Sequence, residues 1–172
     1  MKLAILSDTH GNYPLAVKAL ESLGQLDYII HLGDTTDDAE MIELALGREL
    51  IKLSGNCDMS NKYPELITTT IADKKVLLSH GDRFMVKSGL NLIKQRAKQE
   101  KVDMVLYGHT HRPAILNIDG IMFINPGTMN KNASQWSFAL ISIDNDSITA
   151  ETVDACSILC CAENPTCRQT PG

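Results

Sequence analysis

Apolar and polar residues alternate in short blocks along the first half of the chain. An apolar run over residues 2–6 precedes a segment, 12–24, whose apolar side chains recur at helical spacing, and a second apolar run follows at 28–32. Another helical segment at 37–46 then leads to a third apolar run at 50–53. Because uninterrupted apolar runs joined by helices are typical of buried parallel strands, this half predicts a βαβαβ unit.

The first helical segment also carries end signals. Asn12 is suited to cap its amino end, Pro14 suits its first turn, and Gly24 ends it. Gly47 ends the second helical segment in the same way.

The second half consists mainly of short apolar runs separated by turns. An amphipathic segment at 90–101 predicts one surface helix. Strands are expected on both sides of it, at 66–72, 75–79, 104–107, 114–118, 121–124, 137–143 and 147–153, with turns at 73–74, 119–120 and 145–146. We expect mostly antiparallel pairing here, and for the whole chain an α/β layered domain with one mixed core.

Several of the expected strands end in residues that bind metal ions. In layered α/β sheets, ligands gather beyond the carboxyl ends of the strands, so these side chains should converge. The candidates are Asp8, His10, Asp34, Asn56, His80, His109 and His111. Oxygen and nitrogen ligands of this kind suit Mn²⁺, Fe²⁺ or Zn²⁺ and are too rich in nitrogen for Ca²⁺. Two ions that share a carboxylate fit so many ligands better than one.

Two pairs of these candidates are spaced two residues apart. Asp8 and His10 follow the first apolar run, and His109 and His111 follow the run that ends at Tyr107. Side chains alternate between the two sides of an extended backbone, so each pair is expected to point to one side of an extended chain.

Length and composition narrow the class of protein. The chain has 172 residues, 44% of them hydrophobic, which is enough for one domain that buries roughly 70% of its unfolded surface. Its apolar runs are far shorter than the ~18 residues of a membrane span, and the first run passes directly into Ser7 and Asp8 without a secretory signal pattern. We therefore expect a cytoplasmic protein. A net charge of −5 argues against a dedicated nucleic-acid surface.

The cysteines are unevenly distributed. Cys57 stands alone, and the other four lie close to the end of the chain, at Cys156, Cys160, Cys161 and Cys167. None of them forms the paired C-x-x-C spacing of a zinc site, so we expect free thiols in a loose tail. The predicted division is a domain over residues 1–153 and a cysteine-containing tail over 154–172.

In their order along the chain, five blocks resemble those of the calcineurin-like metallophosphoesterases, and in particular their small single-domain microbial phosphodiesterases. They are Asp8-Thr9-His10, Gly33-Asp34, Gly55-Asn56-Cys57-Asp58, His80-Gly81 and Gly108-His109-Thr110-His111. Asn125-Pro126-Gly127 resembles a further block, and the resemblance covers about residues 1–153. It implies a layered sandwich of two mixed β-sheets flanked by helices, the metallophosphoesterase fold.

The resemblance also implies two divalent metal ions and an enzyme activity. One ion would be held by Asp8, His10 and His111, the other by Asn56, His80 and His109, and Asp34 would bridge them. Mn²⁺ is the ion expected, with Ni²⁺, Fe²⁺, Zn²⁺ and Mg²⁺ as alternatives. The expected function is metal-dependent hydrolysis of a small phosphodiester, by direct attack of a hydroxide that bridges the two ions.

Asn56, Cys57, Asp58 and His80 are the expected catalytic residues. Cys57 stands where many larger relatives have a histidine thought to assist the leaving group. A thiol with a pKa of about 8.5 is a poorer acid at neutral pH than an imidazolium, so we expect a preference for diesters over alkyl monoesters. For Asp58, a local turn or a hydrogen bond behind the ligands is favoured over substrate contact.

Other functions remain open at this point. A phosphomonoesterase, a dinucleoside polyphosphate hydrolase, or a catalytically weak interaction scaffold of the same fold, like a retromer subunit, are the alternatives. The sequence also leaves a homo-oligomer open. His31 lies inside an apolar run and is expected to be a hydrogen-bonded core histidine.

Overall fold

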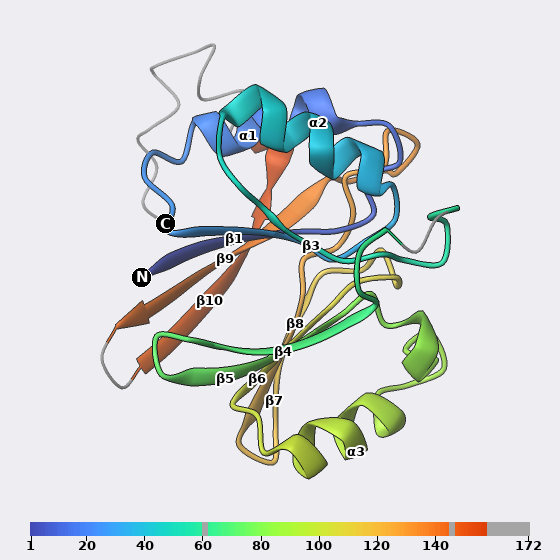
Figure 1. Cartoon of the computed structure of the whole chain (residues 1–172), viewed down its shortest axis with the longest axis vertical. Coiled ribbons are helices and arrows are strands. Elements are labelled where there is room, and N and C mark those ends of the chain that lie inside the picture. Colours follow the sequence, from blue (N-terminus) through green and yellow to red (C-terminus); the bar gives the residue numbers. More distant parts are fainter. Residues whose placement is uncertain (60–61, 145–146, 158–172) are drawn as a thin grey trace.

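Two five-stranded sheets pack face to face, with helices on their outer faces (Figure 1). This computed structural model of the chain describes residues 1–59, 62–144 and 147–157. The first sheet has the strand order β10-β9-β1-β2-β3 and the second the order β4-β5-β6-β8-β7. Both sheets contain parallel and antiparallel pairs, so the layered sandwich of two mixed sheets is confirmed.

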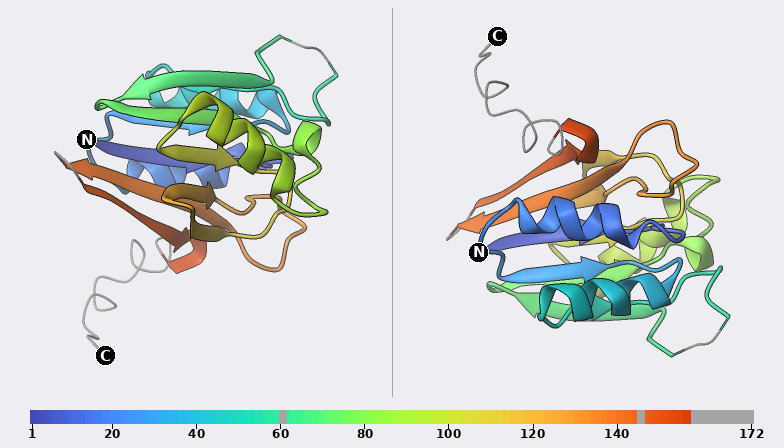
Figure 2. Two further views of the ribbon diagram at one scale, coloured as in Figure 1. Left: turned by 90° about the horizontal axis from the view of Figure 1, so that it is seen from below. Right: turned by 90° about the horizontal axis from the view of Figure 1, so that it is seen from above.

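The first sheet contains the predicted βαβαβ unit. Its strands are β1 (Lys2–Leu6), β2 (Tyr28–His31), β3 (Ile51–Lys52), β9 (Ser137–Asp144) and β10 (Ser147–Asp154). Helices α1 (Tyr13–Glu21) and α2 (Thr36–Leu46) join the three parallel strands and lie side by side over β1 and β2 (Figure 2). Strand β9 pairs antiparallel with β1 from the other side, so the end of the chain returns to the sheet with which it began.

The second sheet is built from the middle of the chain. It contains β4 (Leu66–Ile71), β5 (Lys74–Ser79), β6 (Met104–Tyr107), β7 (Ala114–Ile118) and β8 (Ile121–Asn125). A short 3₁₀ helix at Asp82–Phe84 and helix α3 (Asn91–Glu100) lie between β5 and β6. The expected antiparallel pairing holds for β4 with β5 and for β7 with β8, but β5, β6 and β8 are parallel.

Strand β1 shows how the layers share the apolar side chains. Leu3 and Ile5 point into the core between the sheets, whereas Ala4 and Leu6 belong to the cluster that packs against α1 and α2. A third cluster lies between the second sheet and α3. Because central strands are buried on both faces, they read as continuous apolar runs in the sequence.

One local expectation is corrected, and others concern residues outside the described ranges. Asn12 occupies the N-cap position of α1 but makes no side-chain cap hydrogen bond, and its side-chain N–H donates to the carbonyl of Met129 at 2.7 Å. The turn predicted at 145–146 and the tail cysteines at 160, 161 and 167 lie outside the described residues. Within the described residues, no helix is long and apolar enough to cross a membrane.

His31 is a hydrogen-bonded core histidine, as predicted. Its side chain has no exposed surface, and the N–H of Gly33 donates to Nδ1 at 3.3 Å. Nδ1 is therefore an acceptor, which leaves the proton on Nε2, 3.1 Å from the hydroxyl of Thr9. Burial lowers the pKa of this neutral ring to about 4.

We expect this pKa to make the fold sensitive to acid. The folded chain excludes a proton that the unfolded chain binds, so the stabilisation is complete above pH 6.5 and is lost as the pH falls to about 4. The free energy of unfolding should fall by about 1.4 kcal/mol per pH unit over this range, roughly 3 kcal/mol in total. Urea unfolding of metal-free wild type and His31→Gln at a series of pH values tests it, because the variant lacks this component. Parallel stability curves for the two proteins would contradict the assignment.

Candidate metal centre

The loops that follow the parallel strands bring the predicted ligands together. Six of the seven form two groups whose ligand atoms lie within 4.8 Å of one another, and Asp34 belongs to both. The first group is Asp8, His10, Asp34 and His111, and the second is Asp34, His80 and His109. The seventh candidate, Asn56, adjoins the second group, since its Oδ1 is 3.2 Å from Nε2 of His80.

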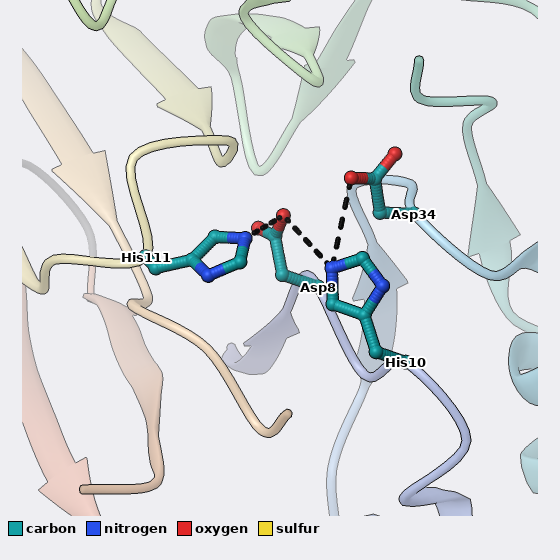
Figure 3. A group of neighbouring side chains, drawn as sticks. All are labelled: Asp8, His10, Asp34 and His111. Carbon is teal, nitrogen blue, oxygen red and sulfur yellow. Dashed lines mark ion pairs between the residues drawn. The ribbon is translucent and has the colours of Figure 1, made fainter. Parts of the chain in front are cut away.

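The first group is arranged around one carboxylate oxygen. Oδ1 of Asp8 lies 3.0 Å from Nε2 of His111 and 3.9 Å from Nε2 of His10. Oδ2 of Asp34 lies 3.7 Å from the same nitrogen of His10. In Figure 3, His111 approaches Asp8 from one side, and His10 and Asp34 lie on the other. Ligands at about 2.0–2.2 Å from one ion are at most about 4.4 Å apart, so these separations suit a shared cation.

His80 organises the second group. Its Nδ1 is 3.1 Å from the carbonyl oxygen of Leu32, which can only accept, so the proton lies on Nδ1. The lone pair of Nε2 then faces three electron-rich atoms, at 3.2 Å from Asn56 Oδ1, 3.2 Å from His109 Nδ1 and 3.4 Å from Asp34 Oδ2. Such a histidine, held through its other nitrogen by a backbone carbonyl, is typical of metal ligands.

Unpartnered polar atoms support a cation at this place. Nε2 of His10 is buried without a hydrogen-bond partner among the described residues, and the buried Oδ1 of Asp8 has imidazole nitrogens beside it. Burial of such atoms is costly unless they are paired or coordinate a metal. The two groups offer only oxygen and nitrogen atoms, so the residues present fit borderline to hard divalent ions.

The pKa shifts of the buried carboxyls and of His80 show that this cluster favours positive charge. Burial alone would raise the pKa of Asp8 and of Asp34, but the neighbouring histidines outweigh it and lower both, and the amide of Cys57 lowers that of Asp34 further. Burial would likewise lower the pKa of His80, yet the carboxylates of Asp34 and Asp8 raise it. A proton or a metal ion can supply this charge, so metal binding should displace protons.

Tight turns, and not extended chain, aim the paired ligands. Asp8 and His10 have φ values of 55° and 44°, and His109 and His111 have 67° and 60°, all in the left-handed region. The expectation of convergence on an extended backbone is therefore wrong, and His109 and His111 belong to different groups. Non-glycine residues seldom adopt these angles, and they cluster at functional sites where the surrounding structure holds them.

Residues behind the ligands hold these turns. At Gly108 any side chain would overlap the hydroxyl of Ser7, and the amide of Asn125 donates to the Gly108 carbonyl at 2.8 Å. The hydroxyl of Thr128 donates to the backbone carbonyl of Asp8, also at 2.8 Å. Asn125 belongs to the block Asn125-Pro126-Gly127, which the sequence analysis singled out, whereas no sequence pattern predicted a role for Thr128.

Asp58 connects two of the ligand loops. Its carboxylate accepts hydrogen bonds from four backbone amides, those of Asp34 (3.2 Å), Thr35 (3.0 Å), Thr36 (2.7 Å) and Gly55 (2.7 Å). The structure thus places Asp58 behind the ligands, where it positions the loop that carries Asp34.

Cys57 lies at the edge of the second group. Its backbone N–H donates to Oδ1 of Asp34 at 2.9 Å, and its sulfur is 3.4 Å from the amide nitrogen of Asn56. Partial desolvation and the Asp34 carboxylate raise the pKa of the thiol to about 11, so at neutral pH it keeps its proton.

Comparison with known proteins identifies relatives of the whole fold. The family model for the calcineurin-like phosphoesterase superfamily domain matches residues 1–146. The probable metallophosphoesterase YsnB of Bacillus subtilis is 28% identical over 157 residues, which are 90% of this chain and 91% of that protein. Phosphodiesterase MJ0936 of Methanocaldococcus jannaschii is 29% identical over 144 residues, covering 74% of this chain and 83% of that protein.

A solved structure confirms the architecture. Wild-type Vps29 from Entamoeba histolytica, in complex with Zn²⁺, matches with a TM-score of 0.72 and 21% identity, over 90% of this chain and 99% of that one. At this level of identity the likeness concerns the fold alone.

Replacement of Asp58 should weaken both the fold and the metal centre. In Asp58→Ala, four amides lose their acceptor, so we expect a loss of roughly 2–4 kcal/mol in the free energy of unfolding. Because the Asp34 loop is no longer held, Mn²⁺ affinity should fall about 10–100-fold. Urea unfolding and calorimetric titration measure the two effects, with the exposed Asp37→Ala as matched control. Wild-type Mn²⁺ affinity in Asp58→Ala would refute this positioning role.

Proposed function

The chain belongs to the calcineurin-like phosphoesterase superfamily, and from this premise we propose that it is a metal-dependent phosphodiesterase that acts on a small substrate. The observation that carries the proposal is the sharing of Asp34 between two groups of oxygen and nitrogen ligands. The names of its relatives support it, since YsnB is described as a probable metallophosphoesterase and MJ0936 as a phosphodiesterase.

In the proposed enzyme, each group of ligands holds one divalent ion. Asp8, His10 and His111 would bind the first, and Asn56, His80 and His109 the second, with Asp34 in contact with both. We propose Mn²⁺, with Ni²⁺, Fe²⁺, Zn²⁺ or Mg²⁺ as alternatives. When bound, two such ions supply an activated water between them for direct attack on phosphorus and neutralise the charge of the phosphoryl oxygens.

The residues around the ions set the charge of the site. Asp8 and Asp34 offset only half of the four positive charges of two divalent ions, so the loaded site stays positive on a chain whose net charge is −5. A phosphoester is therefore attracted locally. Attack of water on phosphorus would place oxygen from solvent on the phosphorus product and not on the released alcohol.

The proposed catalytic roles of the four predicted residues differ. Asn56 and His80 hold an ion, and Asp58 positions the loop of Asp34. The protonated thiol of Cys57 next to Asn56 is a neutral donor for a leaving group, and it brings no positive charge. This favours diesters, because their leaving groups depart with less assistance.

The rival proposal is an interaction scaffold, as suggested by the fold shared with Vps29. That Vps29 structure is itself a complex with Zn²⁺, so a metal centre alone does not separate the two proposals. The enzyme is favoured because MJ0936, 29% identical over 144 residues, is described as a phosphodiesterase.

Metal removal and replacement test the activity directly. After treatment with a chelator, we expect no hydrolysis of bis(p-nitrophenyl) phosphate, and recovery when Mn²⁺ is added, compared with Ni²⁺, Mg²⁺ and Zn²⁺ in turn. The monoester p-nitrophenyl phosphate should be a poorer substrate. Asp34→Asn should lose at least about 100-fold in kcat/KM, whereas the exposed Asp37→Asn should not. Diester hydrolysis that survives chelation would rule the proposal out.

A histidine at position 57 tests the origin of the diester preference. In Cys57→His, an imidazolium could protonate an alkyl leaving group, so monoester hydrolysis should rise by at least about tenfold. Diester hydrolysis should change little, and Cys57→Ser serves as the control for loss of the thiol alone. If Cys57→His gained nothing against monoesters, the thiol would not explain the preference.

A further inference from the structure

A cavity of about 500 Å³ opens beside the metal centre. Its walls come from the loop after β6, the loop before β9 and the last residues of β10. The side chains that matter for the argument are His111, Arg112, Thr128, Gln135, Trp136 and Asp154. The volume is within the range of sites that bind small molecules.

The cavity and the metal centre share a wall. His111 lines the cavity, and its Nε2 lies 3.0 Å from Oδ1 of Asp8. Thr128 lines it too, and its hydroxyl donates to the backbone carbonyl of Asp8. The His111 side chain is 38% exposed, whereas that of Asp8 is fully buried, so the cavity adjoins a ligand that solvent can reach. A phosphoryl group at the metal centre can therefore extend one ester group into the cavity.

Trp136 gives the cavity an aromatic wall in a fixed position. The ring is partly buried against the apolar cluster under α1 and α2, and its Nε1–H donates to the carbonyl of Asn130 at 2.9 Å. Indole rings that are held in this way offer a stacking surface for planar rings, including nucleobases.

Arg112 follows His111 in the chain and lines the same cavity as Trp136. Its backbone N–H donates to the Thr110 hydroxyl at 3.2 Å, which holds the chain next to His111, and the side chain is exposed. Among the residues that the structure describes, no carboxylate forms an ion pair with its guanidinium. A guanidinium in this state can bind phosphate oxygens through two parallel hydrogen bonds.

We propose that this cavity binds the nucleoside part of the substrate, so that the enzyme hydrolyses diesters of nucleotides. The base stacks on Trp136, the phosphate lies between Arg112 and the metal centre, and Gln135 and Asp154 bind the polar edge of the base or the sugar hydroxyls. These polar side chains are exposed, so they offer a nucleoside hydrogen bonds that a plain aryl group cannot make. The inference rests on the proposed function and specifies its substrate class.

Trp136 itself reports the binding, because it is the only tryptophan of the chain. We expect AMP, titrated into metal-free full-length protein, to quench the indole fluorescence saturably when excitation is at wavelengths that adenine does not absorb. Arg112→Ala should weaken AMP binding about tenfold and leave adenosine binding unchanged, because only AMP carries the phosphate. The control is Lys131→Ala, which removes an exposed charge from the same loop as Trp136 but outside the cavity wall.

Three results would overturn the inference. They are unchanged fluorescence with AMP, an equal effect of Arg112→Ala on AMP and adenosine, and phenyl phosphate binding as tightly as AMP. The last result would assign the cavity to simple aryl groups.

A second measurement separates this inference from the proposed function. With Mn²⁺ bound, the p-nitrophenyl ester of thymidine monophosphate should be hydrolysed with a higher kcat/KM than methyl p-nitrophenyl phosphate. Trp136→Leu should lower the ratio of the two kcat/KM values at least about tenfold, and Trp136→Phe should keep most of this ratio. Equal rates for both esters would reject the cavity as a nucleoside site while the phosphodiesterase stands. Quenching by AMP without hydrolysis of either ester would reject the phosphodiesterase while the nucleoside site stands.

Discussion

The metal centre depends on how two buried carboxylates divide their oxygens. Oδ1 of Asp34 accepts the N–H of Cys57, and Oδ2 of Asp8 accepts the N–H of His109. The other oxygen of each faces imidazole nitrogens across 3.0–4.0 Å. Backbone amides thus orient both carboxylates, the neighbouring histidines hold the pKa of each below its usual range, and the second oxygen of each has no backbone donor in the described part of the chain. A cation at this place would stabilise the whole cluster that the ligand loops from both sheets form.

The two sheets make this convergence possible because their central strands are rigid and buried. Strands β1, β2 and β3 of one sheet and β5 and β6 of the other end at the cluster, and the apolar core between the sheets sets their separation. The turns beyond the strands then adopt left-handed conformations at Asp8, Asp34 and His109. Such strained turns persist only where packing holds them, and Gly108 and Asp58 provide that support on opposite sides.

The sequence predicted the strands and helices well, and it singled out the side chains that the structure brings together, because each depends on local patterns. Apolar runs buried on both faces mark β1 and β6, and a polar residue directly after such a run marks a ligand. The pairing of β9 with β1 was beyond reach, since nothing local connects Ala4 to Leu140. The left-handed turns were missed for a similar reason, because the contacts that hold them, such as that of Thr128, come from distant segments.

The arrangement of the two proposed subsites gives a physical reason for a diester. His111, beside the cavity, approaches Asp8 from the side opposite Asp34 (Figure 3). The backbone N–H of Cys57 donates to Asp34, and Cys57 does not line the cavity, so the two proposed places for ester groups are distinct. A phosphate at the centre then has a place for one ester group against Trp136 and for another near the thiol. A monoester would occupy only one of these places and gain binding free energy from a single ester group. A diester would gain binding free energy from both ester groups, which can be used to orient the phosphorus for attack.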